Sequence, residues 1–513
     1  MSSLCYAGFD KLLIISIYNV HLLNSKEKNA INIYKKTINY KLIMNFANFL
    51  LSGKVKNTNQ IFIEKQLRYC DLYSRVKNNY YQYFSKFNKK LIALCIENSE
   101  EFLIFYLSII SSGNTVVILE RGLSEEKYLE YLNKFKIDLL ITRYKFSSTK
   151  FKEEDIPKDK FVKKNVFLFK RKNTKKTLNK NIYKNVALVL FTSGSTGGKK
   201  GVMLTHKNLI TNTSSILKIL PINNREIVNL LLPASYSFGL SVINTHIKVG
   251  AKIYIHDSPF AGSIINELKK YKCTSLYGVP STFEILLEKT NFIKNNFKYI
   301  KYIAQAGGHL QNNYKKIIMS KYLKNFYIMY GATEASPRLS FVPPNKLKDK
   351  LNSIGIPLPG VKFKLFKVKD NKFLQLGAAG DNIMKGYLNE KKLTKKSMSK
   401  KFFLTGDLAY KDKQNYYYLI KRMDKTIKRF GYKINLSLIE NKLKQSIYVK
   451  NCKMNLDNEK ILILIIQTHV EVLEKKIRNA VNILLRKHFA SYEIPDKIIF
   501  TKKNITSYNK SSH

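Results

Sequence analysis

Hydrophobic and polar positions along the chain follow a pattern that predicts strands and helices in alternation. Residues 91–96 and 115–119 are short, almost wholly apolar runs, which is typical of strands buried on both faces. Residues 100–111 between them form a longer run that predicts a helix, and residues 69–87 have the spacing of an amphipathic helix. We therefore expect an α/β fold in which parallel-rich sheets are covered by helices.

The chain changes character after Arg422, which indicates a second and smaller unit. An apolar run at 461–466 predicts a buried strand, and residues 470–488 predict a helix. About 90 residues are enough for a small α+β domain. Residues 145–184 are rich in lysine and lack periodicity, so we expect loop and connecting structure there. The predicted organisation is an N-terminal extension of uncertain status at 1–43, a large domain at 44–421, and a small, mobile α+β domain at 422–513.

The composition adds an extreme charge to this picture. The 513 residues carry a formal net charge of +54, with 45% hydrophobic residues and no tryptophan. Lys, Asn, Ile and Tyr are abundant, and AT-rich codons favour this mixture. Because the charge is also spread along the whole chain, codon bias explains it better than a dedicated site for a polyanion. We expect no nucleic-acid partner, while weak association with an anionic membrane surface stays open.

The spacing of the cysteines and the lengths of the apolar runs indicate the cellular location to expect. Five scattered cysteines with no CxxC pair predict neither a zinc site nor a disulfide framework, and a reducing environment fits them best. No apolar run reaches the length of a membrane span. The expected location is the cytoplasm.

A glycine-rich loop follows a buried strand at residues 186–191. The sequence 186–201 reads VALVLFTSGSTGGKKG, so glycines and hydroxyl side chains follow an apolar run directly. Backbone N–H groups of such a loop can approach phosphate oxygens closely, and the lysines add positive charge. The spacing does not fit the ordinary GxxxxGK[ST] P-loop.

The loop and the VMLTHKNL that follows it resemble the signature of the adenylate-forming superfamily, which contains acyl-CoA synthetases, adenylation domains of peptide synthetases and luciferases. The resemblance is collinear from about residue 61 to the end, although Lys199 stands where the family usually has proline. It implies binding of ATP phosphates by one set of residues: Thr192, Ser193, Gly194, Ser195, Thr196, Gly197 and Lys200.

Further stretches match the family in the expected order. Residues 330–334 read YGATE, so the resemblance places Tyr330, Gly331 and Ala332 near adenine, Thr333 on the α-phosphate, and Glu334 on Mg²⁺. A carboxylate suits that hard cation. The remaining nucleotide contacts implied are Gly307 in a GGHL turn, Asp407 of TGD on the ribose, Arg422 on ribose or phosphate, and Thr196 as a second metal ligand.

The acyl and thiol sides are implied by two more segments. PASYSFGL at 233–240 matches the acyl pocket, with Tyr236 and Phe238 as its walls. No aspartate stands there to pair an α-amino group, so we expect an uncharged acyl tail. Gly431 matches the glycine of the thiol channel, and Asp424 falls at the hinge of the small domain.

The function implied is a two-step ligase. A small-molecule carboxylic acid reacts with Mg²⁺-ATP to give an acyl-adenylate, and a thiol then displaces AMP. The acceptor is coenzyme A or the phosphopantetheine of an acyl carrier protein. Residues 373–387 depart from the family, because an expected glutamate and part of a strand are missing. Three alternatives therefore stay open: a catalytically impaired nucleotide-binding homologue, a protein that loads a small acid or amino acid onto a carrier protein, and a polyanion-binding protein.

The tail TSYNK at 506–510 resembles the family's TSxGK ending and implies that Lys510 acts in adenylation only. A flexible ammonium suits negative charge that develops as pyrophosphate leaves.

We expect Lys510→Ala to slow acyl-adenylate formation about a hundredfold or more, while thioester formation from supplied acyl-adenylate persists. Equal loss in both half-reactions, or in neither, would contradict the role; pyrophosphate release and thioester formation measure the two steps.

Overall fold

The computed structural model describes most of the chain between residues 45 and 501. The described residues are 45–53, 67–145, 148–158, 162, 165–172, 185–193, 199–256, 260–294, 297–322, 325–368, 371–423, 426–429, 432–457, 461–468 and 474–501. Within these ranges, no helix combines the length and the apolar character needed to cross a membrane. The predicted extension at 1–43 lies outside them.

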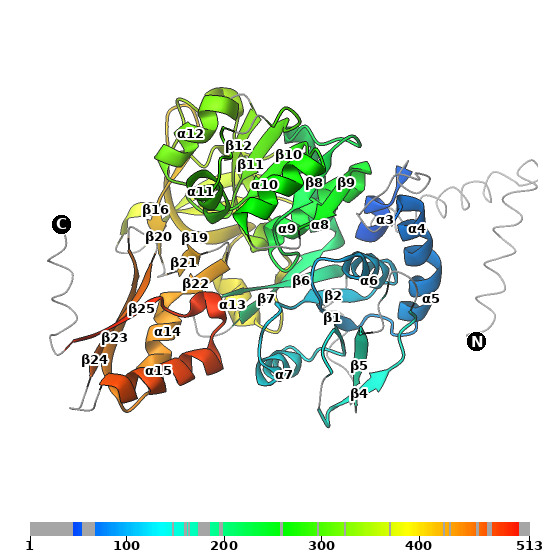
Figure 1. Cartoon of the computed structure of the whole chain (residues 1–513), viewed down its shortest axis with the longest axis horizontal. Coiled ribbons are helices and arrows are strands. Elements are labelled where there is room, and N and C mark those ends of the chain that lie inside the picture. The colour runs from blue at the N-terminus through cyan, green and yellow to red at the C-terminus, as the bar shows by residue number, and fades with distance from the viewer. Residues whose placement is uncertain are drawn as a thin grey trace, which may run out of the picture.

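An eight-stranded sheet in the order β17-β7-β6-β2-β1-β3-β5-β4 forms one side of the molecule (Figure 1). Its strands are β1 (Leu91–Cys95), β2 (Thr115–Ile118), β3 (Leu139–Thr142), β4 (Phe151–Glu154), β5 (Phe167–Arg171), β6 (Val186–Ser193), β7 (Lys199–Thr205) and β17 (Gly386–Tyr387). The central strands β3, β1, β2 and β6 run parallel, whereas both edges are antiparallel. Ile92 and Leu94 of β1 enter one core and Leu91 and Ala93 enter another, so this strand is buried on both faces.

Helices cover both faces of this sheet. One helical run comprises α4 (Tyr69–Ser74), a π-helical segment at Arg75–Asn79 and α5 (Tyr80–Ser85), and it packs with α6 (Glu100–Ser111) and α3 (Phe46–Leu50) into the first core. Ser99 caps α6 by accepting a hydrogen bond from the N–H of Phe102. On the other face, α7 (Glu125–Lys134) buries Tyr128 and Leu132.

A seven-stranded sheet in the order β14-β13-β12-β11-β10-β8-β9 lies beside the first one (Figure 1). Its strands are β8 (Ile227–Leu230), β9 (Lys252–Ile255), β10 (Ser275–Gly278), β11 (Tyr302–Gln305), β12 (Phe326–Gly331), β13 (Arg338–Val342) and β14 (Ile356–Pro357). Its helices are α8 (His206–Ile219), α9 (Ser237–Val249), α10 (Ala261–Lys270), α11 (Pro280–Lys289) and α12 (Asn312–Tyr322). The largest core cluster contains residues of both sheets together with α8 and α9, so it joins the two sheets into one body.

The remaining elements form smaller sheets. β15 (Lys362–Val368), β16 (Asn371–Ala379), β19 (Phe402–Lys411), β18 (Met398–Ser399) and β20 (Tyr417–Arg422) make an antiparallel sheet, with α13 (Lys391–Lys396) before β18. Two strands, β21 (Thr426–Arg429) and β22 (Tyr432–Asn435), form a hairpin. After it come α14 (Leu436–Leu443), β23 (Val449–Leu456), β24 (Leu462–Thr468), α15 (Glu474–His488) and β25 (Lys497–Thr501), which share a separate core (Figure 1).

The predicted α/β class is confirmed, and so are the predicted strands and helices, to within a few residues at their ends. One expectation was wrong. Residues 145–184 contain the edge strand β4 and its neighbour β5, which lies between β3 and β4. β4 has few apolar residues because an edge strand needs few, and β5 is a short apolar run among lysine-rich residues. Residues 373–387, which depart from the family pattern, begin within β16, and this strand pairs with β15 and β19. The domain boundaries stay predictions.

Candidate functional site

A cavity of about 680 Å³, partly open to solvent, lies where both large sheets meet the C-terminal elements. The cavity brings together seven of the residues implicated by sequence, from segments up to 141 positions apart. These are Thr192, Tyr236, Phe238, Gly307, Gly331, Ala332 and Thr333.

The turn after β12 carries the two side chains expected at the phosphates and the metal. Thr333 and Glu334 form a single turn of 3₁₀ helix, Thr333–Ala335, and both are buried. The Thr333 hydroxyl lies 3.1 Å from the Ser237 hydroxyl at the start of α9. The Tyr387 hydroxyl donates to Glu334 Oε1 at 3.0 Å. Burial, followed by the neighbouring Glu334 carboxylate, raises the pKa of Tyr387, so this hydroxyl keeps its proton and its hydrogen bond at neutral pH.

Close backbone approach explains two glycines of the site. A Cβ at Gly331 would lie 2.1 Å from the Pro337 carbonyl oxygen, and Ala332 donates its N–H to that same oxygen at 2.9 Å. Gly307 has φ +89°, and a Cβ there would lie 2.6 Å from the Tyr236 hydroxyl. Larger residues would therefore close the turn or push Tyr236 out of the cavity wall.

Asp407 and Arg422 meet on neighbouring strands beside this turn. Asp407 Oδ1 lies 2.7 Å from Nη1 of Arg422, because β19 and β20 pair these two residues directly. The Tyr330 hydroxyl donates to the other Asp407 oxygen at 2.5 Å. Burial, followed by the Asp407 charge, raises the pKa of Tyr330. The carboxylate keeps lone pairs for further donors such as a ribose diol.

Some expected residues cannot be placed. Gly194, Ser195, Thr196, Gly197, Gly431 and Lys510 lie outside the described residues, as does Asp424. Ser193 ends β6, and its side chain also lies outside the described set. Lys200 lies on β7, with its ammonium 5.5 Å from the centre of the Tyr387 ring.

The donor set at the turn fits a magnesium nucleotide. Glu334 supplies a carboxylate, and Mg²⁺ commonly takes one or two carboxylates while phosphates and water complete its shell. The adjacent Thr333 supplies a hydroxyl that suits a phosphate oxygen. Within the described ranges, no group of three or more His, Cys, Asp or Glu residues forms a self-sufficient metal cage. The oxygens present therefore suit a cation that arrives with a polyphosphate.

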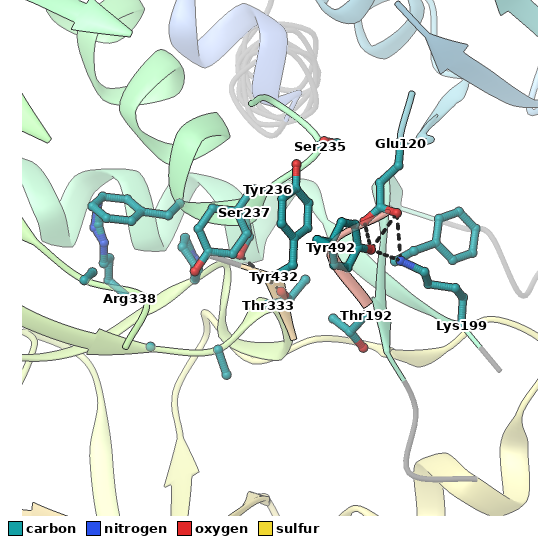
Figure 2. Close-up of a pocket in the computed structure, with 17 residues that line it drawn as sticks. Glu120, Thr192, Lys199, Ser235, Tyr236, Ser237, Thr333, Arg338, Tyr432 and Tyr492 are labelled. Carbon is teal, nitrogen blue, oxygen red and sulfur yellow. Dashed lines mark hydrogen bonds and ion pairs between the residues drawn. The ribbon is translucent and has the colours of Figure 1, made fainter. Parts of the chain in front are cut away.

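Sequence reasoning missed a cluster that joins the C-terminal elements to the first sheet. Lys199 Nζ lies 2.8 Å from Glu120 Oε2 and donates to the Tyr492 hydroxyl at 3.1 Å. That hydroxyl lies 3.1 and 3.0 Å from the two Glu120 oxygens (Figure 2). The Tyr492 ring stacks on Tyr432 of β22 with a centroid distance of 4.1 Å. The one signal in the sequence was Lys199 itself, which occupies a position where the resemblance expected proline.

Neighbouring carboxylates keep the Lys199 ammonium charged. Burial works to lower the pKa of Lys199, but the Glu120 and Glu493 carboxylates outweigh it and hold that pKa above its ordinary value. Burial, followed by Glu120, raises the pKa of the Tyr492 hydroxyl, which therefore stays protonated. A charged lysine and a hydroxyl donor thus face one carboxylate across the interface.

A comparison with protein-family models places the chain in a family. The profile described as AMP-binding enzyme matches residues 86–388, more than half of the chain. The chain belongs to the AMP-binding enzyme family. The match contains the phosphate loop, the Thr333–Glu334 turn and the acyl-pocket segment, whereas Asp407, Arg422 and Tyr492 lie beyond its end.

Individual relatives are distant. A luciferin 4-monooxygenase from Photuris pensylvanica is 28% identical over 52% of this chain and 50% of its own length. A probable 4-coumarate–CoA ligase 3 from Dictyostelium discoideum is 30% identical over 50% of this chain and 48% of its own. The chain spans about half the length of most of the curated relatives it matches.

Solved structures of the same family fold agree with the architecture. The o-succinylbenzoate CoA synthetase of Bacillus subtilis superposes with a TM-score of 0.73 at 20% identity, over 89% of this chain and 96% of that one. At this identity the similarity establishes the fold alone. It does confirm the two-sheet body with further C-terminal sheets.

The Tyr492 contact generates a test of how the C-terminal elements are held. Tyr492→Phe removes the hydroxyl that bridges Glu120 and Lys199 while it keeps the stacking on Tyr432. We expect limited proteolysis between β20 and β22 to become roughly tenfold faster, the equivalent of about 1.4 kcal/mol.

Tyr448→Phe is the matched control, because the Tyr448 hydroxyl makes no hydrogen bond to any described residue. Cleavage rates that are equal in the two variants would show that the Tyr492 hydroxyl does not hold the interface.

Proposed function

We propose that the protein is an AMP-forming acid–thiol ligase. Its substrate is a small carboxylic acid, its energy source is ATP with Mg²⁺, and its acceptor is the thiol of coenzyme A or of a carrier-protein phosphopantetheine. The observation that carries the proposal is that Thr192 and Thr333 line one cavity. Glu334 follows Thr333, and the Asp407–Arg422 pair is bonded to Tyr330, directly before the lining residue Gly331. Membership of the AMP-binding enzyme family supports the same chemistry.

In the first half-reaction, an oxygen of the acid attacks the α-phosphorus of ATP. The bond to the pyrophosphate oxygen breaks, and an acyl-adenylate forms. Thr333 is placed to donate a hydrogen bond to an α-phosphate oxygen, since its hydroxyl faces the cavity beside Ser237. Glu334, together with Thr196 as the resemblance implies, would hold Mg²⁺, and this cation would supply positive charge beside the pyrophosphate leaving group.

Asp407 positions the nucleotide. Its carboxylate is fixed from one side by Arg422 and from the other by Tyr330, so its remaining lone pairs have a defined direction toward a ribose. Fixing the acceptor in advance reduces the entropy lost when the diol binds. Arg422 also keeps positive charge near the phosphates.

In the second half-reaction, the thiol sulfur attacks the carbonyl carbon of the acyl-adenylate and AMP leaves as the thiol proton is released. The resemblance assigns Gly431 to the thiol channel. Tyr432, directly after it, lines the described cavity and lies beside Tyr236, with ring centroids 6.5 Å apart. The proximity of Tyr432 to Tyr236 supports a thiol that arrives from the side of the β21–β22 hairpin.

Pyrophosphate release with a panel of carboxylic acids tests the proposal. Release that depends on one acid, followed by thioester formation with coenzyme A or a phosphopantetheinylated carrier, is the expected result. ATP binding with no release for any acid would instead support an impaired nucleotide-binding homologue. Salt-dependent nucleic-acid binding without adenylation would support the polyanion alternative.

Glu334→Gln tests the metal role. The amide keeps the shape and the hydrogen bond from Tyr387 but removes the charge, so we expect pyrophosphate release to fall about a hundredfold or more. Asp381→Asn is the matched control, because Asp381 pairs with Lys207 at the surface and is not part of the cavity wall. Near-normal release by Glu334→Gln, with unchanged melting temperatures, would refute the role.

A further inference from the structure

Arg338 is a buried guanidinium in the wall of the cavity. It begins β13 and is only 2% exposed. Two side-chain amides fix its backbone: Asn212 donates to its carbonyl oxygen at 2.8 Å, and Asn382 does so at 3.4 Å. The side chain therefore starts from a rigid position.

No carboxylate in the described part of the chain lies within ion-pairing distance of Arg338, and its Nε has no hydrogen-bond partner there. Its Nη1 donates only to the Met329 sulfur, at 3.7 Å, and the guanidinium carbon lies 4.1 Å from the centre of the Phe238 ring. Tyr236, Tyr277 and Tyr302 contribute the nearest titratable groups, and these are neutral hydroxyls. Burial lowers the pKa of Arg338 to about 10, so it remains charged at neutral pH.

Packing alone does not account for this charge. Burying an ion without a counterion is costly, and a cation over a phenyl ring recovers only part of that cost. Methionine or leucine would fill the same wall without that cost. The chain carries 90 lysines and arginines, and among the described ones only Lys315 and Arg338 are buried. A cation without a carboxylate partner in this wall is therefore a feature of the cavity.

The position of Arg338 relative to the reaction end is visible in Figure 2. Arg338 lies at the opposite end of the drawn residues from Lys199, Glu120 and Tyr492, while Thr333 and Ser237 lie between. An acid whose reacting carboxylate meets Thr333 can therefore extend its other end toward Arg338. Glu120, the one carboxylate lining the cavity, is already paired with Lys199.

We propose that the acid activated by this enzyme carries a second carboxylate, which the Arg338 guanidinium binds at the far end of the acyl pocket. This inference rests on the proposed ligase function and names its substrate class as dicarboxylic acids. It revises the uncharged tail expected from sequence. A planar guanidinium binds a carboxylate through two parallel hydrogen bonds, and the bound carboxylate supplies the counterion that the buried guanidinium lacks. A neutral tail would leave that charge without a partner, and an α-ammonium group would be repelled.

Matched acids provide the test. Pyrophosphate release is measured for butyrate against succinate, valerate against glutarate and hexanoate against adipate. We expect at least one dicarboxylate to exceed its monocarboxylate about a hundredfold in kcat/KM, with an optimum length. Better turnover of every monocarboxylate would overturn the proposal.

Two substitutions assign the preference to Arg338. Arg338→Met should lower kcat/KM for the preferred dicarboxylate about a hundredfold, mainly through KM, and should leave monocarboxylates equal or improved. Arg338→Lys should keep part of the preference for dicarboxylates, because lysine retains the positive charge but cannot donate two parallel hydrogen bonds to a carboxylate. Arg171→Met, on strand β5 and outside the cavity wall, is the control and should not change acid preference. Equal loss for both acid classes in Arg338→Met would show a packing role and refute the assignment.

Direct binding separates this inference from the ligase function. If no acid supports pyrophosphate release, the ligase proposal fails, and calorimetric titration of the same dicarboxylates still tests Arg338. Binding to the wild-type protein that is lost in Arg338→Met would support the site without catalysis. Absence of binding to the wild-type protein, in the presence of ATP, would overturn it.

Discussion

Buried amide hydrogen bonds hold the turn between β12 and β13, and the candidate site depends on them. The Asn382 side-chain amide donates to the Ala335 carbonyl at 3.0 Å, and the Asn382 backbone carbonyl accepts from the Ser336 hydroxyl at 2.9 Å. Asn212 of α8 holds the other end at Arg338. Met384 donates its N–H to the Glu334 carbonyl at 2.8 Å. An irregular turn between strands has few backbone partners of its own, so side chains from other segments must satisfy it.

This arrangement gives a physical meaning to the segment that departed most from the family pattern. Residues 380–387 lack the expected glutamate before them, yet Asn382, Met384 and Tyr387 all bond to the Thr333–Arg338 region. The same segment pairs with β7 through β17, next to the phosphate loop. One stretch of chain thus fixes the Glu334 carboxylate relative to β7, and its retained residues Asn382, Met384 and Tyr387 are the ones that contact the turn.

The electrostatics of the cavity divide it into two ends. At one end Lys199 pairs with Glu120, and the Tyr492 hydroxyl bonds to the same carboxylate and ties the C-terminal elements to the large body. At the other end a buried arginine has no counterion among the described residues. Since a buried charge is stable only when it is paired, the first end is complete in the protein alone, and the second is completed by a ligand.

The sequence by itself determined the α/β class, most strands and helices, and the collinear motifs, because apolar periodicity and glycine-rich turns are local properties of the chain. It also identified Thr333, Glu334, Asp407 and Arg422 as a set. Only the tertiary structure brought Tyr492 to Lys199, 293 positions away, and showed β4 and β5 at an edge. It alone decided that Arg338 is buried without an acid, since burial and pairing depend on which distant segments fold around a residue, and no local pattern records that.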